Sequence, residues 1–539
     1  MARPAAAARL MIVLAFLAVP ALAQEPPPGL PWIESYGVAD YQGHKQNWDV
    51  AQGPDGLLYV AGGSSLLVFD GVDWRRYGTP NNGRIRSFQV ADDGRIWVGS
   101  EDDFGWFERD AAGGLAFHSL ADRIPASQRP FGDVRQVVIL DEQVIFQTTG
   151  RLFHWADGKL SSRSPWGNRF RIVFVHNGRL FVLVDDAIYP LDGFDDEAPG
   201  PAPDPRWPLA PGTQATFLLP WDGDTLLLGT YADGLFLIDS EGPRPFNDDA
   251  ALATAWPYTA ERMADGSLAV GTIHGGLFQL DATGRVLVHL DSDNGLPVDT
   301  TLGLGLDHQG GLWLSQENAI TRIALASPLR RYGESFGLTD VEGIARVDGH
   351  WMFAGSGGLA VHDPGAGELR FLDVPQNELF GLLATASGVL LAGSNGVYQV
   401  DIDFEAPAVL AVEPVFEDTF SYDVVASRHR PVVYVGTESG LGLIERVDGR
   451  WVNRGLVPGV TQRADTIAED GDGRVWVGTG TGVVQALEWG AAQVPEVTLT
   501  LDAADGVPAG NAWVFSFGDD VIFATTEGGY RLSADTPPR

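Results

Sequence analysis

The residue types that do chemistry in enzymes are present in this chain, but their spacing matches no catalytic motif. The ten histidines include no His-Glu-x-x-His pair that would bind zinc, and no Gly-x-Ser-x-Gly turn presents a nucleophilic serine. No Gly-rich loop carries a phosphate-binding lysine. The chain has no cysteine, which excludes thiol catalysis, thiolate metal sites and disulfides. We therefore expect no metal, no cofactor and no catalytic residue.

Two acidic segments partly match calcium-binding loops. Residues 291–295 read Asp-Ser-Asp-Asn-Gly, and residues 470–473 read Asp-Gly-Asp-Gly. Neither has the full alternation of ligands or the Glu at the twelfth loop position. Asp and Gly are also the residues that tight turns favour, so turns are the preferred interpretation.

The charge of the chain disfavours nucleic acid as a partner. Lys and Arg number 36 against 71 Asp and Glu, which gives a formal net charge of −35. Such a surface repels phosphate backbones and anionic membranes. An acidic, solubilising surface is a simpler explanation than a specific cation site.

The first 23 residues have the pattern of a secretory signal peptide. Arg3 and Arg9 precede the apolar run 10–19, and Ala-Leu-Ala at 21–23 forms a cleavage site of small residues. The apolar run is too short to span a bilayer, and no later stretch is long enough. We expect export to the periplasm, with no membrane span beyond the signal peptide.

A short phrase recurs twelve times between residues 61 and 524 and points to the architecture. It is an Asp-Gly or Asn-Gly turn, then an apolar strand that ends in a small residue, as in residues 93–100, 265–272 and 472–479. An all-strand repeat of roughly 40–45 residues is typical of β-propeller blades. We therefore expect an all-β fold of tandem propellers with about twelve four-stranded blades.

The second repeat shows how one blade forms. Residues 84–90 alternate as a strand, Asp93-Gly94 favours a type I′ turn, and 95–100, 104–108 and 115–120 supply three more strands. One position in the second strand of several repeats is aromatic, and we expect these side chains to pack between neighbouring blades. They are Tyr59, Trp97, Trp313, Tyr434 and Trp476.

Twelve blades are too many for one ring, since closed rings usually hold four to eight. We expect a first propeller over residues 30–327 with repeats 1–7, and a second over 328–539 with five repeats that leave its ring incomplete. The Pro-containing bridge at 324–332 would link them. Two rings of six blades are the alternative.

The loops opposite the Asp-Gly turns are the expected binding face. Irregular polar and aromatic residues gather in the links into each first strand and in the connections from second to third strand, and loops on a rigid scaffold often carry function. The ligand-binding candidates are Asn47, Trp48, Asn82, Arg84, Glu101, Asp103, Tyr231, His274, Gln316 and Glu317.

The repeats resemble those of the two-component regulator propellers, the extracytoplasmic sensor regions of bacterial hybrid histidine kinases, related transcriptional regulators and diguanylate cyclases. The resemblance rests on the repeats and on the Gly-Leu-Pro lead-in at 294–297, weakened at 505–508. Residues 47–52 and 67–74 resemble the first blade of members with a triple-tyrosine domain, and 98–107 resemble the second. Members typically have fourteen blades in two rings of seven, followed by a triple-tyrosine domain and a membrane helix, and this sequence departs from them in stopping after its twelfth repeat.

The resemblance implies a periplasmic sensor that binds a small molecule, for which a saccharide is one candidate, without catalysis. It also suggests signalling through the pairing of two chains, and so a homodimer. Two alternatives stay open. A propeller-fold glycoside hydrolase or lyase would use two carboxylates as acid and base, and a periplasmic scaffold would bind proteins through its rim.

Overall fold

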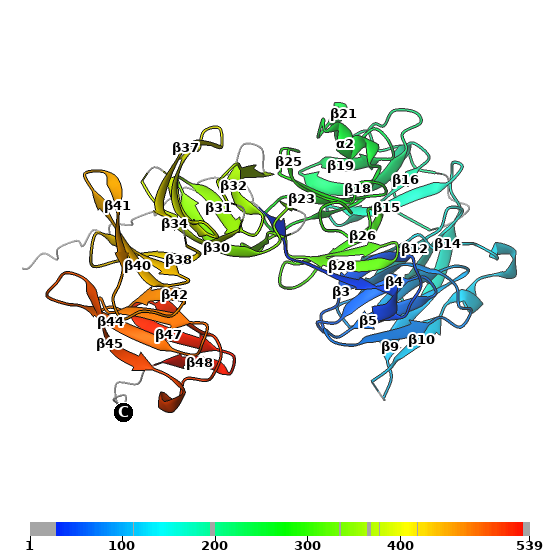
Figure 1. The fold of residues 1–539 in the computed structure, drawn as a ribbon. Helices are drawn as coiled ribbons and strands as arrows, with labels where there is room; N and C mark the ends of the chain where they lie inside the picture. The colour runs from blue at the N-terminus through cyan, green and yellow to red at the C-terminus, as the bar shows by residue number, and fades with distance from the viewer. Residues whose placement is uncertain are drawn as a thin grey trace, which may run out of the picture. The chain divides into compact units, whose positions relative to one another are not determined.

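The computed structural model describes residues 29–111, 113–194, 200–333, 336–363, 368–376, 378–386, 388–417 and 419–531. The expected signal peptide, residues 1–23, lies outside these ranges. Almost all regular structure is antiparallel β-sheet, with two short helices, α1 (Val38–Tyr41) and α2 (Ala250–Thr254) (Figure 1). The predicted all-β fold is confirmed. No helix in the described ranges is long and apolar enough to span a bilayer.

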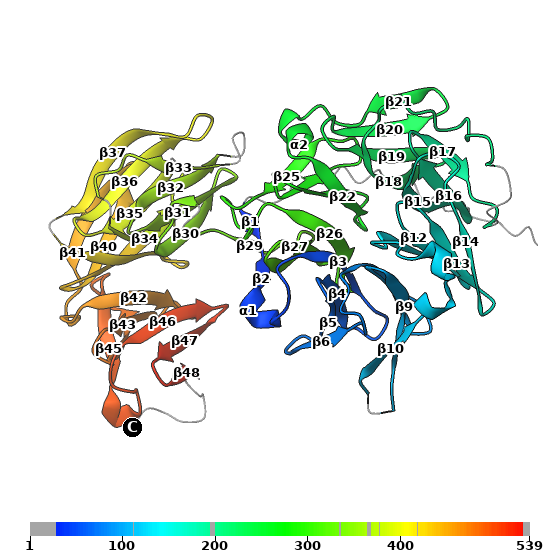
Figure 2. The same cartoon turned by 90° about the vertical axis from the view of Figure 1, so that its right-hand side faces the viewer.

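The chain divides into two compact units, residues 1–331 and 332–539. The first unit contains seven sheets of propeller type, which follow one another from β3 to β28 (Figure 2). Their inner strands contact each other in order, and β26 contacts β3, so the series closes on itself.

The strands of the first three sheets are β3 (Asn47–Gln52), β4 (Leu58–Gly62), β5 (Ser65–Phe69), β6 (Trp74–Gly78); β7 (Ile85–Val90), β8 (Ile96–Ser100), β9 (Asp103–Arg109), β10 (Leu115–Ser119); and β11 (Gln136–Leu140), β12 (Gln143–Gln147), β13 (Leu152–Ala156), β14 (Lys159–Arg163). The next three are β15 (Phe170–His176), β16 (Arg179–Val184), β17 (Ala187–Pro190); β18 (Ala215–Asp222), β19 (Thr225–Thr230), β20 (Leu235–Asp239), β21 (Gly242–Pro245); and β22 (Pro257–Arg262), β23 (Leu268–Thr272), β24 (Leu277–Leu280), β25 (Val286–Leu290).

The seventh sheet joins the two ends of the first unit. Strands β26 (Thr301–Leu306), β27 (Leu312–Gln316) and β28 (Ala319–Ile323) are completed by β2 (Ile33–Gly37) from the start of the chain, in the order β2-β28-β27-β26. Beside it, β1 (Leu30–Pro31) pairs with β29 (Arg330–Arg331). The pairing of β2 with β28 covers an edge that β28 would otherwise expose. The repeat pattern did not predict it, because β2 lies before the first copy of the phrase.

The described residues of the second unit form five sheets. Their strands are β30 (Val341–Val347), β31 (His350–Gly355), β32 (Gly358–Asp363), β33 (Glu368–Leu372); β34 (Leu379–Ala384), β35 (Gly388–Gly393), β36 (Gly396–Asp403), β37 (Ala408–Glu417); β38 (Ser421–Ala426), β39 (Val432–Thr437), β40 (Gly440–Val447), β41 (Arg450–Leu456); β42 (Ala464–Glu469), β43 (Val475–Thr479), β44 (Val484–Trp489), β45 (Pro495–Leu501); and β46 (Ala512–Phe517), β47 (Asp520–Thr525), β48 (Gly528–Arg531).

The first and last inner strands of this unit carry exposed apolar side chains. Ile344 on β30 is 59% exposed, and Phe515 and Phe517 on β46 are 52% and 73% exposed. The inner strand of a middle sheet, β38, instead buries Ser421 and Val424. The apolar core of the described unit is therefore least complete at the two ends of its series of sheets.

The aromatic position in the second strand packs as expected. All five side chains are buried, and Trp97 lies 6.1 Å from Phe146 of the next sheet, between ring centroids. A turn aspartate also binds several of these rings: Asp307 accepts from Trp313 Nε1 at 3.1 Å, and Asp470 from Trp476 Nε1 at 2.9 Å. Asp470 also accepts the backbone N–H of Arg474 at 2.9 Å, so this aspartate stabilises the turn at residues 470–473.

The turn type predicted at Asp93-Gly94 is wrong. A type I′ turn needs positive φ at both central residues, whereas here Gly94 has a φ of 85° and Asp93 does not have a positive φ. Asp93 Oδ1 instead accepts the N–H of Arg95 at 3.0 Å, which stabilises a longer loop with a left-handed Gly at its end. Asn177-Gly178, with φ of 48° and 69°, has the positive φ pair.

Candidate functional site

A cavity of about 1180 Å³ runs along the inner strands of the first unit. All seven inner strands line it, from β3 through β7, β11, β15, β18 and β22 to β26. Ligand pockets typically measure 300–1,000 Å³. The cavity is therefore large enough to hold a small molecule, and the inner strands decide its chemistry.

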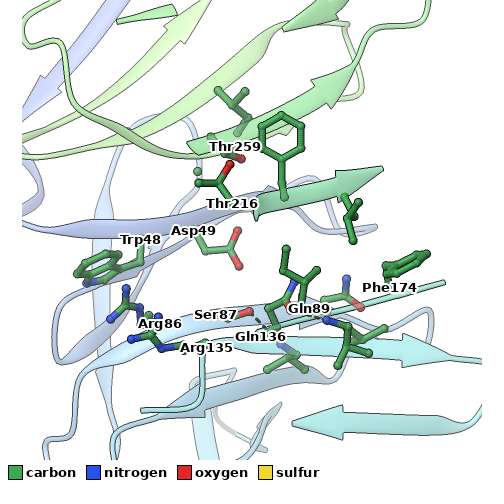
Figure 3. Close-up of a pocket in the computed structure, with 18 of the residues that line it drawn as sticks. Trp48, Asp49, Arg86, Ser87, Gln89, Arg135, Gln136, Phe174, Thr216 and Thr259 are labelled. Atoms are coloured by element: carbon green, nitrogen blue, oxygen red, sulfur yellow. Dashed lines mark hydrogen bonds between the residues drawn. The ribbon is translucent and has the colours of Figure 1, made fainter. Parts of the chain in front are cut away.

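Side chains clamp three of the inner strands, β3, β7 and β11, to the next strand in the series. Phe88 N–H donates to Asp49 Oδ2 at 3.1 Å, and Val137 N–H donates to Ser87 Oγ at 3.1 Å. Val173 N–H donates to Gln136 Oε1 at 2.8 Å (Figure 3). These bonds satisfy backbone donors that strand pairing leaves free where two blades meet.

A hydrogen bond of the same kind in the second unit shows why Asp49 is buried in the cavity. Asp423 accepts the N–H of Ile467 at 2.9 Å, as Asp49 accepts that of Phe88. Burial raises the pKa of Asp49 to about 7 and that of Asp423 to about 6, against the lowering effect of these backbone bonds. Because the arrangement recurs in both units, a structural role accounts for Asp49 without catalysis.

Glu261 on β22 is the other carboxyl group inside the cavity with a shifted pKa. Burial raises its pKa to about 7, and repulsion from Asp49 adds to the shift. Two acidic groups that titrate near neutrality would suit acid–base chemistry in an enzyme. Glu261 is therefore the residue on which a hydrolase or lyase reading would depend.

One mouth of the cavity is lined by residues at the same position of successive inner strands. Most of these strands have a register shift near their start, as between Ile85 and Ser87. Such a bulge redirects a side chain at the rim of a sheet. In chain order the residues at this position are Trp48, Arg86, Arg135, Arg171, Thr216, Tyr258 and Leu302, and all of them line the cavity.

The cationic residues of this set lie in β7, directly before β11, and in β15, which are three consecutive inner strands. The guanidinium of Arg86 lies 4.1 Å from the ring centroid of Trp48 and 3.3 Å from Asp133 Oδ2. In Figure 3 Arg86 and Arg135 lie side by side near Trp48. Arg171 donates to the carbonyls of Thr213 and Ala215, both at 3.2 Å.

Aromatic side chains occupy the rim above β18 and β22. The ring centroids of Tyr231 and Trp256 are 4.6 Å apart, and those of Trp256 and His274 are 4.4 Å apart. Trp256 has a φ of 62°, a left-handed conformation that is rare for a bulky residue and is often found at functional sites. Tyr231 also lines the cavity, so this cluster adjoins the mouth.

The structure separates the predicted site residues into three groups. Trp48 and Tyr231 line the cavity. Arg84, Glu101 and His274 lie near its rim: Arg84 pairs with Asp133 at 3.5 Å and with Glu101 at 3.8 Å, and His274 contacts Trp256.

The remaining predicted residues have local contacts instead. Asn47 is fully buried and donates to Tyr41 and to two backbone carbonyls, and Gln316 is fully buried with a bond to Val298 O at 2.9 Å. Asp103 is buried and accepts from Ser119 at 2.6 Å. Asn82 lies in an exposed turn, and Glu317 donates its N–H to Thr300 O.

Sequence reasoning missed most of the mouth. Arg86, Arg135 and Arg171 are inside or directly before strands, whereas the candidates were sought in loops. A partial signal was present in the sequence: Arg135 and Arg171 lie 12 residues before the small-residue step of their repeats, and Arg86 lies 13 residues before its own.

The comparisons with known proteins agree with this architecture. The family model for two-component regulator propellers matches residues 79–102 and 460–481, one segment in each unit, so the chain carries repeats of this kind and the resemblance seen in the sequence is confirmed. The extracellular domain of a putative hybrid two-component system from B. thetaiotaomicron has the same fold, with a TM-score of 0.64 at 15% identity over 93% of this chain and 71% of its own.

Two other solved structures are more distant. A second extracellular domain of a putative hybrid two-component system from the same organism gives a TM-score of 0.43 at 15% identity, over 95% of this chain and 72% of its own. Virginiamycin B lyase from Staphylococcus aureus gives 0.41 at 11% identity, over 54% of this chain and 98% of its own. A comparison with curated protein sequences found no match.

Proposed function

We propose that this chain is the extracytoplasmic sensory part of a bacterial signal-transduction receptor and binds a small molecule, without turnover, in the cavity of the first unit. The observation that carries the proposal is the cavity itself, which all seven inner strands line and which bears arginines and aromatic rings at one mouth. Loops and strand ends on a rigid scaffold are usual places for binding.

Three further observations support a sensory role. The propeller repeats match a family model named for two-component regulators, and a protein of the same fold is described as the extracellular domain of a hybrid two-component system. The pattern of residues 1–23 supports export to the periplasm. Ligand binding would then change the pairing or orientation of two chains.

A thermal-shift screen of the purified chain against periplasmic solutes tests the proposal, because a ligand that binds only the folded state raises the melting temperature. We expect a stoichiometric binder whose effect is lost when Trp48 is replaced by Ala. Turnover of a solute, with loss of activity in Glu261→Gln, would contradict the proposal in favour of a hydrolase or lyase. Capture of a protein without any small ligand would favour the scaffold.

A further inference from the structure

The mouth of the cavity has two chemically different halves. Arg86 and Arg171 lie in the inner strands β7 and β15, and Arg135 directly precedes β11, which lies between them. Arg169 directly precedes β15 and also lines the cavity. The equivalent residues of the three neighbouring strands β22, β26 and β3 are Tyr258, Leu302 and Trp48. One half is therefore cationic and the other half is aromatic and apolar, with Thr216 of β18 between them.

The repeat itself does not require arginine at this position. In the second unit the residues at the corresponding register shifts are Glu342, Phe380, Tyr422 and Asp465. Acidic, aromatic and basic side chains are thus all compatible with the fold. The three successive arginines of the first unit need an explanation other than blade packing.

The charge of the arginines is only partly compensated within the protein. Asp133 pairs with Arg86 at 3.3 Å and Arg84 at 3.5 Å, and Arg171 is held by backbone carbonyls, which carry no charge. Among the residues that the structure describes, the guanidinium groups of Arg135 and Arg169 have no hydrogen-bond or ion-pair partner. Burial lowers the pKa of Arg171, and repulsion from Arg169 adds to the effect.

Such an arrangement is unusual in a chain with a net charge of −35. Acidic residues outnumber basic ones about twofold, and yet Arg135 and Arg169 are exposed at the cavity mouth without a carboxylate partner among the described residues. Like charges held close together destabilise the free protein. A ligand that supplies the missing negative charge would remove this cost.

Arginine also specifies the geometry of the anion. Its planar fork matches a carboxylate through two parallel hydrogen bonds. The opposite half offers the ring of Tyr258 and the face of Trp48 that Arg86 does not cover, and both suit an apolar or planar part of the same ligand.

We propose that this mouth binds an organic carboxylate with a flat apolar portion, its carboxylate held by Arg135 with Arg169 and its flat portion lying on the Trp48 and Tyr258 side. The proposal rests on the proposed function, since it names the ligand class of the same cavity.

The test compares pairs of probes that differ only in the carboxylate: benzoate with benzamide, indole-3-acetate with indole-3-acetamide, and glucuronate with its methyl ester. Inorganic phosphate is added as an anion without an apolar part. Affinities of the whole chain are measured by calorimetry, and the quenching of tryptophan fluorescence is compared with that of Trp48→Phe to locate the site. We expect the carboxylate of at least one pair to bind about 10- to 100-fold more tightly than its neutral partner, as charged hydrogen bonds imply.

The key variant is Arg135→Gln, with Arg244→Gln as the matched control. Arg244 lies on β21, where it is exposed and pairs with Asp239 at 3.6 Å, so its loss changes the net charge equally. We expect R135Q to weaken carboxylate binding about 10- to 100-fold. The melting temperature of free R135Q should equal or exceed that of the parent, because a repulsive charge has been removed, whereas an arginine needed for folding would lower it.

The outcomes separate the ligand class from the proposed function. Equal binding of a neutral partner overturns the carboxylate proposal but leaves a small-molecule sensor. Equal binding of phosphate, unchanged carboxylate affinity in R135Q, or a destabilised R135Q also overturns it. If no probe binds, the carboxylate proposal falls, while the thermal-shift screen of periplasmic solutes decides separately whether the chain binds any small molecule.

Discussion

Replacing Glu261 by Gln should stabilise the first unit, and the gain should grow with pH. The pKa of Glu261 is raised from its ordinary 4.5 to about 7, chiefly by burial. A raised acid pKa means that the folded state keeps a proton which the unfolded state has already released. Between the two pKa values stability therefore falls as pH rises, and it levels off above the folded pKa. Gln removes this loss because it does not ionise.

The size of the effect follows from these two pKa values. One pKa unit corresponds to about 1.36 kcal/mol. The raised pKa of Glu261 therefore lowers the free energy of unfolding by about 1 kcal/mol at pH 5 and by about 3 kcal/mol at pH 8, as an upper bound. A constant difference in packing between Glu and Gln shifts both values equally. The increase of about 2 kcal/mol between the two pH values therefore reports the ionisation alone.

The assay is urea unfolding of the parent and E261Q between pH 5 and pH 8. Glu241→Gln is the control, because Glu241 is exposed in the turn between β20 and β21 of the same unit. We expect the midpoint of E261Q to move above that of the parent as pH rises, while E241Q follows the parent. A difference in urea midpoint between E261Q and the parent that stays constant from pH 5 to pH 8 would refute the reasoning.

Three other perturbations test the fold. Gly276→Ala should lower the free energy of unfolding by about 3 kcal/mol, because φ is 70° and a Cβ would lie 2.1 Å from Leu290 O. In the same urea assay Gly310→Ala should lower it by about 1 kcal/mol, because φ is 79° but the space around the residue is open. Asp470→Ala should cost about 1–3 kcal/mol, and a double-mutant cycle with Trp476→Phe should give a coupling near 1 kcal/mol; additive effects would contradict the bond from Trp476 to Asp470. Removing residues 1–37 deletes β2, so we expect a lower melting temperature and more aggregation by light scattering; an unchanged melting temperature would show that the seventh sheet does not need β2.

The sequence predicts the individual strands of each blade, but it does not predict the pairing that closes the first unit. Each blade has its own turn and its own apolar strands, such as Ile96–Ser100, so local pattern predicts it. The pairing of β2 with β28 is a contact between segments at opposite ends of the first unit, and no local pattern marks it. The expected boundary after residue 327 lies four residues before the division at Arg331.

Of the residues expected at the site from the sequence, two line the cavity and the others do not. Trp48 and Tyr231 were found because they are aromatic residues near strand ends on the expected face. Asn47 and Gln316 are also near strand ends on this face, but both are buried and their side-chain amides donate hydrogen bonds to backbone carbonyls. The arginines were missed because the alternation within a strand does not show which residue a bulge turns into the cavity.

The pairing of β2 with β28 also sets the order in which the first unit can fold, because its seventh sheet is complete only when both strands are available. Ser35 and Thr321, which bond across this pair, are 286 residues apart in the chain. At about 5–20 residues per second, β2 waits on the order of 15–60 s for its partner to be synthesised. Until β28 is available, β2 has no strand to join and the seventh sheet cannot be completed. A factor that keeps the N-terminal segment extended until β28 is available would therefore favour correct closure of the first unit.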